Sequence, residues 1–183
     1  EDTITVQNSR DALNISGNAG SDTVNVEGTG AGTLTTITPG GDAGDAVNIT
    51  NGGVLSAVNG NVTVVGGGTT ALTVDDSANS SATTSTLTAT DLTFSVPATI
   101  GDIHFSGLAS FELSLGSGGN TLGINNTISG VSTIHSGTGN DTVTIAATGG
   151  PLTLNTQAGN DTVNIQGISA PASVNNTGGS DIF

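Results

Sequence analysis

The sequence predicts an all-β fold, a right-handed parallel β-helix (β-solenoid) with a period of about 20 residues. A motif repeats, because the segment 133–145 recurs one period later as 153–165 and a further copy occupies 14–26. Each copy contains two stretches of alternating apolar residues, one on each side of a glycine turn, and this alternation is the periodicity of β-strands. Right-handed crossovers are the general preference in such folds, so we expect that hand.

Six aspartates mark the repeat. They stand at positions 2, 22, 45, 141, 161 and 181, so that successive positions differ by 20, 23, 96, 20 and 20 residues. Asn120 stands 21 residues before Asp141, at the matching place. A repeat of this length is too short for a helix pair or a propeller blade, whereas one strand–turn–strand coil per period forms a parallel solenoid.

The composition agrees with a thin, regular core. The 183 residues include 29 Gly and four Phe, and no Trp, Tyr, Met or Cys. Residues that favour helix are scarce and β-branched residues are common, so we expect almost no α-helix. Disorder is the competing interpretation for a polar chain of net charge −14, but 33% of the residues are hydrophobic and these alternate in a fixed pattern.

The alternation places the strands in order along a single solenoid domain, residues 1–183. Regular coils are expected over 1–50 and 113–183, and looser coils over 51–112. The expected strands are 3–6, 12–15, 23–26, 34–37, 46–50, 54–58, 62–65, 72–74, 87–89, 92–96, 103–105 and 111–115. The polar run 75–85 is predicted to be a protruding loop, and Val96 before Pro97 is predicted to end a strand. The chain starts and stops within copies of the motif, so we expect a segment of a longer array.

Two sets of side chains are predicted from the same alternation. The inward set should form one stacked file: Val24, Val26, Val47, Ile49, Leu122, Ile124, Val143, Ile145, Val163 and Ile165. The outward set should stack at one position of successive coils and bond along the stack: Asn25, Asn48, Thr144 and Asn164.

The charge excludes several classes of partner. Fifteen acidic residues stand against one basic residue, whereas nucleic acids and anionic membranes require a cationic surface. No apolar stretch is long enough to insert into a membrane. The absence of cysteine is typical of an extracellular bacterial protein that needs no disulfides. A cation is the natural counterpart of this surface.

The segment 136–144 resembles the calcium-binding nonapeptide of the repeats-in-toxin (RTX-like, hemolysin-type) family, and 17–25 and 156–164 resemble it less completely. The resemblance implies Ca²⁺ bound in turns along one edge of the solenoid, with Asp22, Asp45, Asp141, Asp161 and Asp181 as ligands. Two alternatives without metal remain open. Each Asp could cap its own turn, or the neighbouring amides of residues 139, 140 and 142 could hold the carboxylate.

Enzymatic activity is not expected. Arg10 is the sole basic side chain, and the acids Asp75 and Asp76 are adjacent, so on a strand they would face opposite ways. His104 and His135 show no spacing typical of a metal or catalytic site.

The block 70–77, followed by 86–88, 103–108 and 113–118, also looks like a unit that recurs in very large bacterial surface and adhesin-like proteins. It therefore predicts a structural or adhesive module at the cell surface, stacked head to tail with like copies and in contact with surface glycans. The alternative is a carbohydrate-binding or carbohydrate-active β-helix.

Overall fold

Every regular element of the chain is a β-strand. The computed structural model describes residues 1–182, and within them there are fifteen strands and no helix. The described residues therefore contain no helix of the length and hydropathy needed to span a membrane. The expectation that the chain lacks helix is confirmed, in keeping with its β-branched composition.

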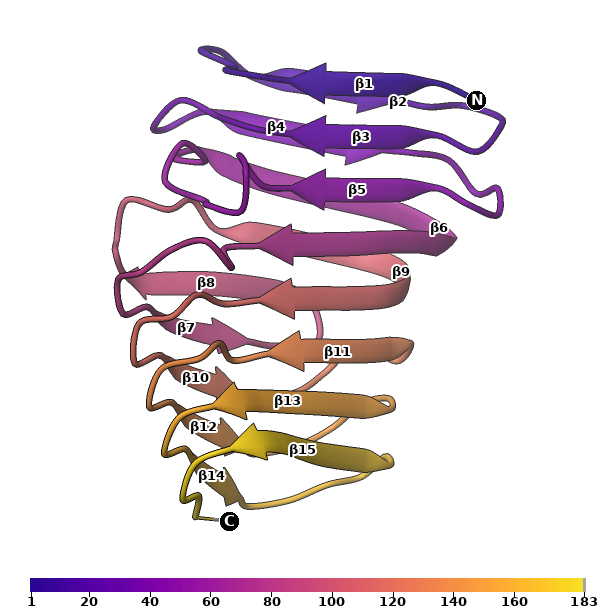
Figure 1. The fold of residues 1–183 in the computed structure, drawn as a ribbon. Helices are drawn as coiled ribbons and strands as arrows, with labels where there is room; N and C mark the ends of the chain where they lie inside the picture. The colour runs from indigo at the N-terminus through magenta and orange to yellow at the C-terminus, as the bar shows by residue number, and fades with distance from the viewer. Residues whose placement is uncertain (183) are drawn as a thin grey trace.

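The strands form two stacks that run along a common axis, with the N- and C-termini at opposite ends (Figure 1). The first stack contains β1 (Thr3–Val6), β3 (Thr23–Val26), β5 (Ala46–Ile49), the second half of β6 (Asn61–Asp75), the second half of β9 (Ile103–Ser114), β11 (Val131–His135), β13 (Leu152–Ala158) and β15 (Ala172–Gly178). The second stack contains β2 (Leu13–Ser16), β4 (Leu34–Thr38), the first halves of β6 and β9, β8 (Asp91–Val96), β7 (Thr84–Leu87), β10 (Thr121–Ile124), β12 (Thr142–Ile145) and β14 (Thr162–Ile165).

Most neighbours within a stack are parallel and pair like residue with like residue. Thr3 pairs with Thr23 in the first stack, and Thr142 pairs with Thr162 in the second. The strands β6 and β9 are long because each bends from the second stack into the first. The result is a mostly parallel, solenoid-like sheet.

A hairpin interrupts the parallel order. β7 and β8 are antiparallel, and β8 is also antiparallel to β9. The chain leaves β6, forms β7, returns along β8 and only then continues into β9 (Figure 1). The expectation of a purely parallel fold is wrong here, because alternating apolar residues suit a strand of either direction.

The inward set is almost entirely buried, but it does not form one file. Its members in β3 and β5 belong to the first stack, and those in β10, β12 and β14 belong to the second. Ile165 is 47% exposed because no further coil covers the end of the second stack. The outward set divides in the same way: Asn48 donates to Asn25 in the first stack (2.9 Å), while Thr144 pairs with Asn164 in the second.

Two strand predictions are wrong, and four others each cover only part of a longer strand. The segment 54–58 is not a strand, and 87–89 runs from the end of β7 into the hairpin turn, since β7 ends at Leu87. The segments predicted at 62–65 and 72–74 belong to the single strand β6, as 103–105 and 111–115 belong largely to β9. The residues 76–83 do connect two strands, but Asp76 is buried among them. Val96 ends β8 before Pro97, as predicted.

Candidate functional site

Four residues form a ladder at the turns before the last strands of the second stack. We call Asn120, Asp141, Asp161 and Asp181 the lower ladder. The backbone N–H of each residue donates to Oδ1 of the next, with distances of 2.7 Å from Asn120 to Asp141, 2.9 Å from Asp141 to Asp161 and 2.8 Å from Asp161 to Asp181. Each carboxylate therefore joins two successive coils.

A second ladder lies near the N-terminus. We call Asp2, Asp22 and Asp45 the upper ladder. The N–H of Asp2 donates to Asp22 Oδ1 (2.7 Å), and the N–H of Asp22 donates to Asp45 Oδ1 (3.0 Å). It ends there because Thr70 occupies the matching position of the next coil, immediately before the residue that pairs with Ala46.

The two ladders occupy different edges of the molecule. The upper ladder precedes strands of the first stack, whereas the lower ladder precedes strands of the second. The expectation of a single edge is therefore wrong. The amide that each Oδ1 accepts also comes from the preceding coil, and not from the carboxylate's own turn.

In several coils the other turn carries a threonine that bonds to the next coil. Thr127 Oγ1 accepts the N–H groups of Gly149 (3.0 Å) and Gly150 (3.1 Å) in the next coil, and Thr148 bonds to the following coil in the same way. Thr29 Oγ1 accepts the N–H of Gly60 (2.8 Å). Thr29 follows β3 of the first stack, whereas Thr127 follows β10 of the second. The threonine turns therefore change edge between the upper and the lower ladder, as the aspartate turns do.

The ladder carboxylates are removed from water. Asp22, Asp45, Asp141 and Asp161 are each 1% exposed. Burial raises the pKa of Asp141 to about 6, although hydrogen bonds from the Asn120 N–H and the Ser136 hydroxyl oppose this rise. The Ser136 hydroxyl donates to Asp141 Oδ2 at 2.7 Å, so both oxygens of this carboxylate have partners.

Three other ladder carboxylates are only half satisfied. The Oδ2 atoms of Asp22, Asp45 and Asp161 are buried and have no hydrogen-bond partner among the described residues. A buried polar atom without a partner is costly, so these oxygens are the places where a cation would be favourable. Calcium, however, takes about six to eight oxygen ligands. The described residues contain no group of three acidic or histidine side chains around one point.

Calcium therefore fits the described residues only in part. The free oxygens of neighbouring rungs can supply one or two carboxylate ligands, and Oδ1 of Asp22, Asp45 and Asp161 already accepts a backbone N–H. The remaining ligands would have to be backbone carbonyls and water.

Asn120 shows that a ladder position works without charge. Its Oδ1 accepts both the N–H and the hydroxyl of Thr83 at 2.9 Å, and its Nδ2 donates to the carbonyls of Gly116 (3.0 Å) and Ser136 (2.8 Å). The spacing pointed to Asn120, but nothing in the sequence pointed to Thr83 as its partner. An uncharged amide can therefore make all the hydrogen bonds that join the coils at this position.

We compared the chain with known protein families, curated proteins and solved structures. Nothing matches.

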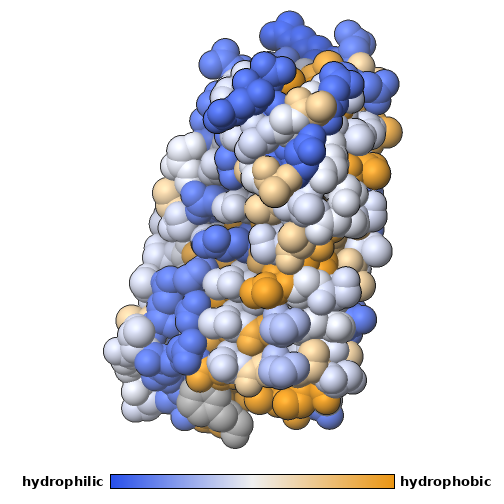
Figure 2. Space-filling view, turned by 90° about the vertical axis from the view of Figure 1, so that its right-hand side faces the viewer, coloured by the Kyte–Doolittle hydropathy of each residue, from blue (hydrophilic) through white to orange (hydrophobic). Residues whose placement is uncertain are grey.

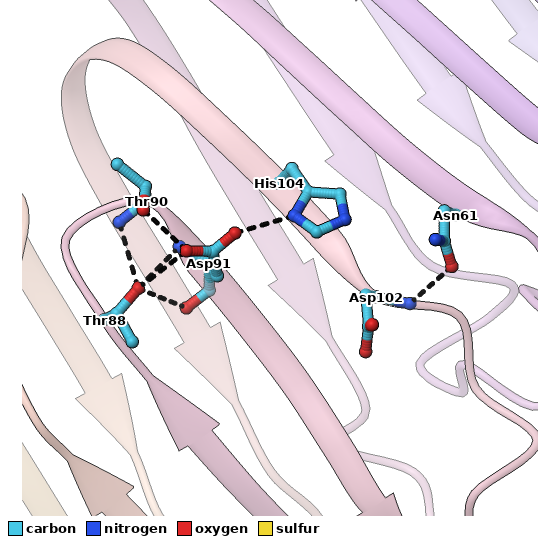
Figure 3. Close-up of polar contacts among 6 residues, drawn as sticks. All are labelled: Asn61, Thr88, Thr90, Asp91, Asp102 and His104. Atoms are coloured by element: carbon cyan, nitrogen blue, oxygen red, sulfur yellow. Dashed lines mark hydrogen bonds and ion pairs between the residues drawn. The ribbon is translucent and has the colours of Figure 1, made fainter.

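Titratable side chains also gather on the outer face beside the hairpin (Figure 3). His104 Nδ1 lies 2.6 Å from Asp91 Oδ1, and the hydroxyls of Thr88 and Thr90 donate to Asp91 Oδ2. The hydrogen bond from Thr90, followed by that from His104, lowers the pKa of Asp91. The group fastens the hairpin to β9, because Asp91 and His104 pair across the two strands.

The remaining candidates are separated from one another. Asp75 Oδ1 accepts the N–H of Ser77, whereas Asp76 is buried and accepts from Leu55 and Asn79, so the two acids do not act as a pair. Burial raises the pKa of Asp76. His135 Nε2 lies 3.7 Å from Glu112 on the outer face.

A cavity of about 310 Å³ lies beside His135. Its polar lining comprises Ser77, Ser114, Ser117, Thr138, His135 and Gln157.

Proposed function

We propose that the chain is a structural and adhesive module of a large extracellular bacterial surface protein, which stacks end to end with like copies into a rod or filament. The coils form a right-handed solenoid with a period of about 20 residues, related to RTX-like repeats. Catalysis has no part in this proposal.

The observation that carries the proposal is the regular stack of coils, in which neighbouring strands pair like residue with like. A stack of this kind can be continued by any coil of the same register, because each coil contacts only its neighbours. Ile168 and Ile182 are 54% and 67% exposed at the C-terminal end. Figure 2 shows hydrophobic surface gathered at that end, beneath a largely polar side.

Electron microscopy and light scattering of the isolated chain test the proposal. Rods are expected in which each copy adds roughly 40 Å, from about eight or nine coils at ~4.8 Å each. A monomer that persists at high protein concentration would exclude end-to-end stacking.

Calcium is the second part of the proposal. The free Oδ2 atoms of Asp22, Asp45 and Asp161 are its proposed ligands, completed by carbonyls and water. An ion present at about 100 times its dissociation constant adds about 2.7 kcal/mol to the free energy of unfolding. For a chain of this size that corresponds to a rise in Tm of about 5–10 °C. Thermal unfolding followed by circular dichroism, with calcium, magnesium or chelator, measures it, and equal Tm values in all three would reject the ion.

Carbohydrate binding is the alternative function. The hydroxyl, imidazole and amide groups that line the cavity beside His135 favour it, since they can donate to and accept from sugar hydroxyls. Titration of the chain with bacterial surface oligosaccharides by NMR tests it. Shifts confined to the amides of Ser117, His135 and Gln157 would support this function.

A further inference from the structure

Three irregular connections of the chain meet at one place. They are the segments 50–60 between β5 and β6, 76–83 between β6 and β7, and 97–102 between β8 and β9. All three lie at the left-hand ends of the strands in Figure 1, beside the hairpin. Side chains from each segment line a cavity of about 340 Å³. This cavity and the one beside His135 are lined by different residues.

The wall of this cavity is mostly apolar. Its hydrophobic lining comprises Val54, Ala82, Val96, Pro97 and Ile100. Val96 is 49% exposed, so this apolar surface can be reached from solvent. Sites for small molecules are typically clefts of about 300–1,000 Å³ with an apolar lining and a few polar groups that fix the orientation of the ligand. The size and the lining of this cavity meet these conditions.

A buried carboxyl group lies in the wall. Asp76 is 1% exposed, and it accepts one hydrogen bond at each oxygen, from the N–H of Leu55 to Oδ1 and from Nδ2 of Asn79 to Oδ2, both 2.9 Å. An ionised carboxylate oxygen can accept about two hydrogen bonds, so each oxygen retains accepting capacity. Burial raises the pKa of Asp76, because the charged form is desolvated more than these hydrogen bonds stabilise it. A positive charge in the cavity would balance the carboxylate.

The lining favours an organic cation over a metal ion. Asp76 is the only acidic or histidine side chain among the described residues that line the cavity, whereas a metal ion takes several such ligands. An ammonium group has three donors, which can be shared between Asp76 and the exposed hydroxyls of Ser56 and Ser81. An apolar body attached to it would cover the wall. The net charge of −14 attracts such cations to the chain.

We propose that this cavity binds a small organic ammonium compound that carries an apolar group, with Asp76 as the partner of the ammonium. The proposal does not depend on end-to-end stacking. A cavity of about 150 Å³ in another protein takes benzene, so about 340 Å³ has room for a ring and a short aminoalkyl chain. Phenethylammonium is therefore a suitable probe.

NMR titration of the isotope-labelled chain tests the site. Phenethylammonium chloride should shift the amides of Val54, Ala82 and Ile100, which represent the three segments, and should leave the amides of the two ladders in place. Phenethyl alcohol has the same shape without the charge and should bind at least about tenfold more weakly, because charge-assisted hydrogen bonds are the stronger ones. Hydrocinnamate, an anion of similar shape, should not bind. Sodium chloride holds the ionic strength constant in all three titrations.

Asp76→Asn tests the role of the carboxylate. It keeps an Oδ1 for the N–H of Leu55 and removes the charge, so the affinity for phenethylammonium should fall at least about tenfold and that for the alcohol should change less than about twofold. Asp75→Asn is the matched control, because Asp75 is the adjacent acid and its Oδ1 accepts the N–H of Ser77 outside the cavity. It removes the same charge but should weaken phenethylammonium binding less than about threefold, since exposed charges are screened by salt.

Ala82→Trp tests the apolar wall separately. Ala82 is exposed at the cavity, so the indole can fill the space without entering the core. This variant should lose binding of both phenethylammonium and phenethyl alcohol. Circular dichroism checks that each variant folds. If Asp76→Asn does not fold, the comparison of the ammonium with the alcohol in the wild type decides the role of charge.

The outcomes separate the parts of the proposal. If no probe shifts Val54, Ala82 and Ile100, the cavity is not a binding site. Equal affinities for phenethylammonium and phenethyl alcohol, or an unchanged affinity in Asp76→Asn, would overturn the assignment to an ammonium compound. Shifts spread over the acidic turns would show attraction to the net charge alone and would overturn it too. A monomeric chain that binds phenethylammonium in the cavity would contradict only the end-to-end stacking.

Discussion

Replacing Asp141 with Asn should stabilise the protein at neutral pH. The amide keeps an Oδ1 that accepts the Asn120 N–H, which the wild type holds at 2.7 Å. Its new Nδ2 group would correspond to Nδ2 of Asn120 in the preceding coil. There, Nδ2 donates to two backbone carbonyls, those of Gly116 and Ser136. The Ser136 hydroxyl loses Oδ2 as an acceptor but keeps the Thr156 carbonyl (3.3 Å). The substitution therefore preserves the rung and removes a buried charge.

The magnitude follows from the pKa of Asp141. Burial raises this pKa from 3.8 to about 6, a difference of roughly two units, and each unit corresponds to about 1.4 kcal/mol. Because the folded-state pKa is raised, the contribution of Asp141 to stability is complete below pH 3.8. The wild type loses up to about 3 kcal/mol of that contribution as the pH rises through 6.

We expect Asp141→Asn to match the wild type within about 1 kcal/mol at pH 4 and to exceed it by about 1–3 kcal/mol at pH 7.5. Urea unfolding at several pH values measures the difference. Asp141→Ala is the control: it also lacks the charge but leaves the Asn120 N–H without its acceptor, so it should be less stable than Asp141→Asn by about 1–3 kcal/mol at both pH values. If Asp141→Asn is instead destabilised at pH 7.5, the carboxylate is needed in its charged form, as a calcium ligand would be.

Three further substitutions test the packing. Val163→Asp buries a charge at a side chain that is 2% exposed and should lower the free energy of unfolding by more than about 4 kcal/mol. Asn164→Asp, at the exposed neighbouring position, should change it by less than about 0.5 kcal/mol. Equal urea midpoints for the two variants would contradict the inward register. Gly137→Ala should cost more than about 2 kcal/mol, because Gly137 has φ of +100° and its Cβ would come within 1.8 Å of the Gly116 carbonyl oxygen, and a Tm like that of the wild type would refute this contact. His104→Ala removes a half-exposed pair with Asp91 and should cost less than about 1 kcal/mol in urea unfolding at pH 5.5, so a larger loss would show that the pair organises the whole hairpin.

The positions of the ladder residues could be read from the sequence, but their partners could not. The spacing of Asp141, Asp161 and Asp181 required equivalent places in successive coils, and the structure keeps them there. The bond from each amide to the next coil's carboxylate depends on how closely the coils approach. That approach is set by glycines such as Gly137, and spacing alone does not report it.

The edge that each ladder occupies could not be predicted for a different reason. Both turns of a regular coil are short, and the motif occurs once per coil. The sequence pattern is therefore the same whether the Asp lies on one edge of the solenoid or on the other. The choice depends on the segment between the ladders, where β6 and β9 cross from one stack to the other and the hairpin adds β8 to the second. Strand direction in that segment is a tertiary property, because the antiparallel strand β8 alternates buried and exposed residues as the parallel strands of the stacks do.

The ladders explain how so thin a core can hold a register. A slip of one residue would turn every inward side chain outward, and large side chains that could lock the register by shape are almost absent. A buried Oδ1 that accepts an amide of the neighbouring coil forbids the slip, because the amide would then be left without a partner at a cost of about 1–3 kcal/mol. Threonine does the same at the opposite turn. Coils that carry both bonds are thus fixed to their neighbours at both edges. Since these bonds join only adjacent coils, loss of one rung should open the chain at that coil before it unfolds elsewhere.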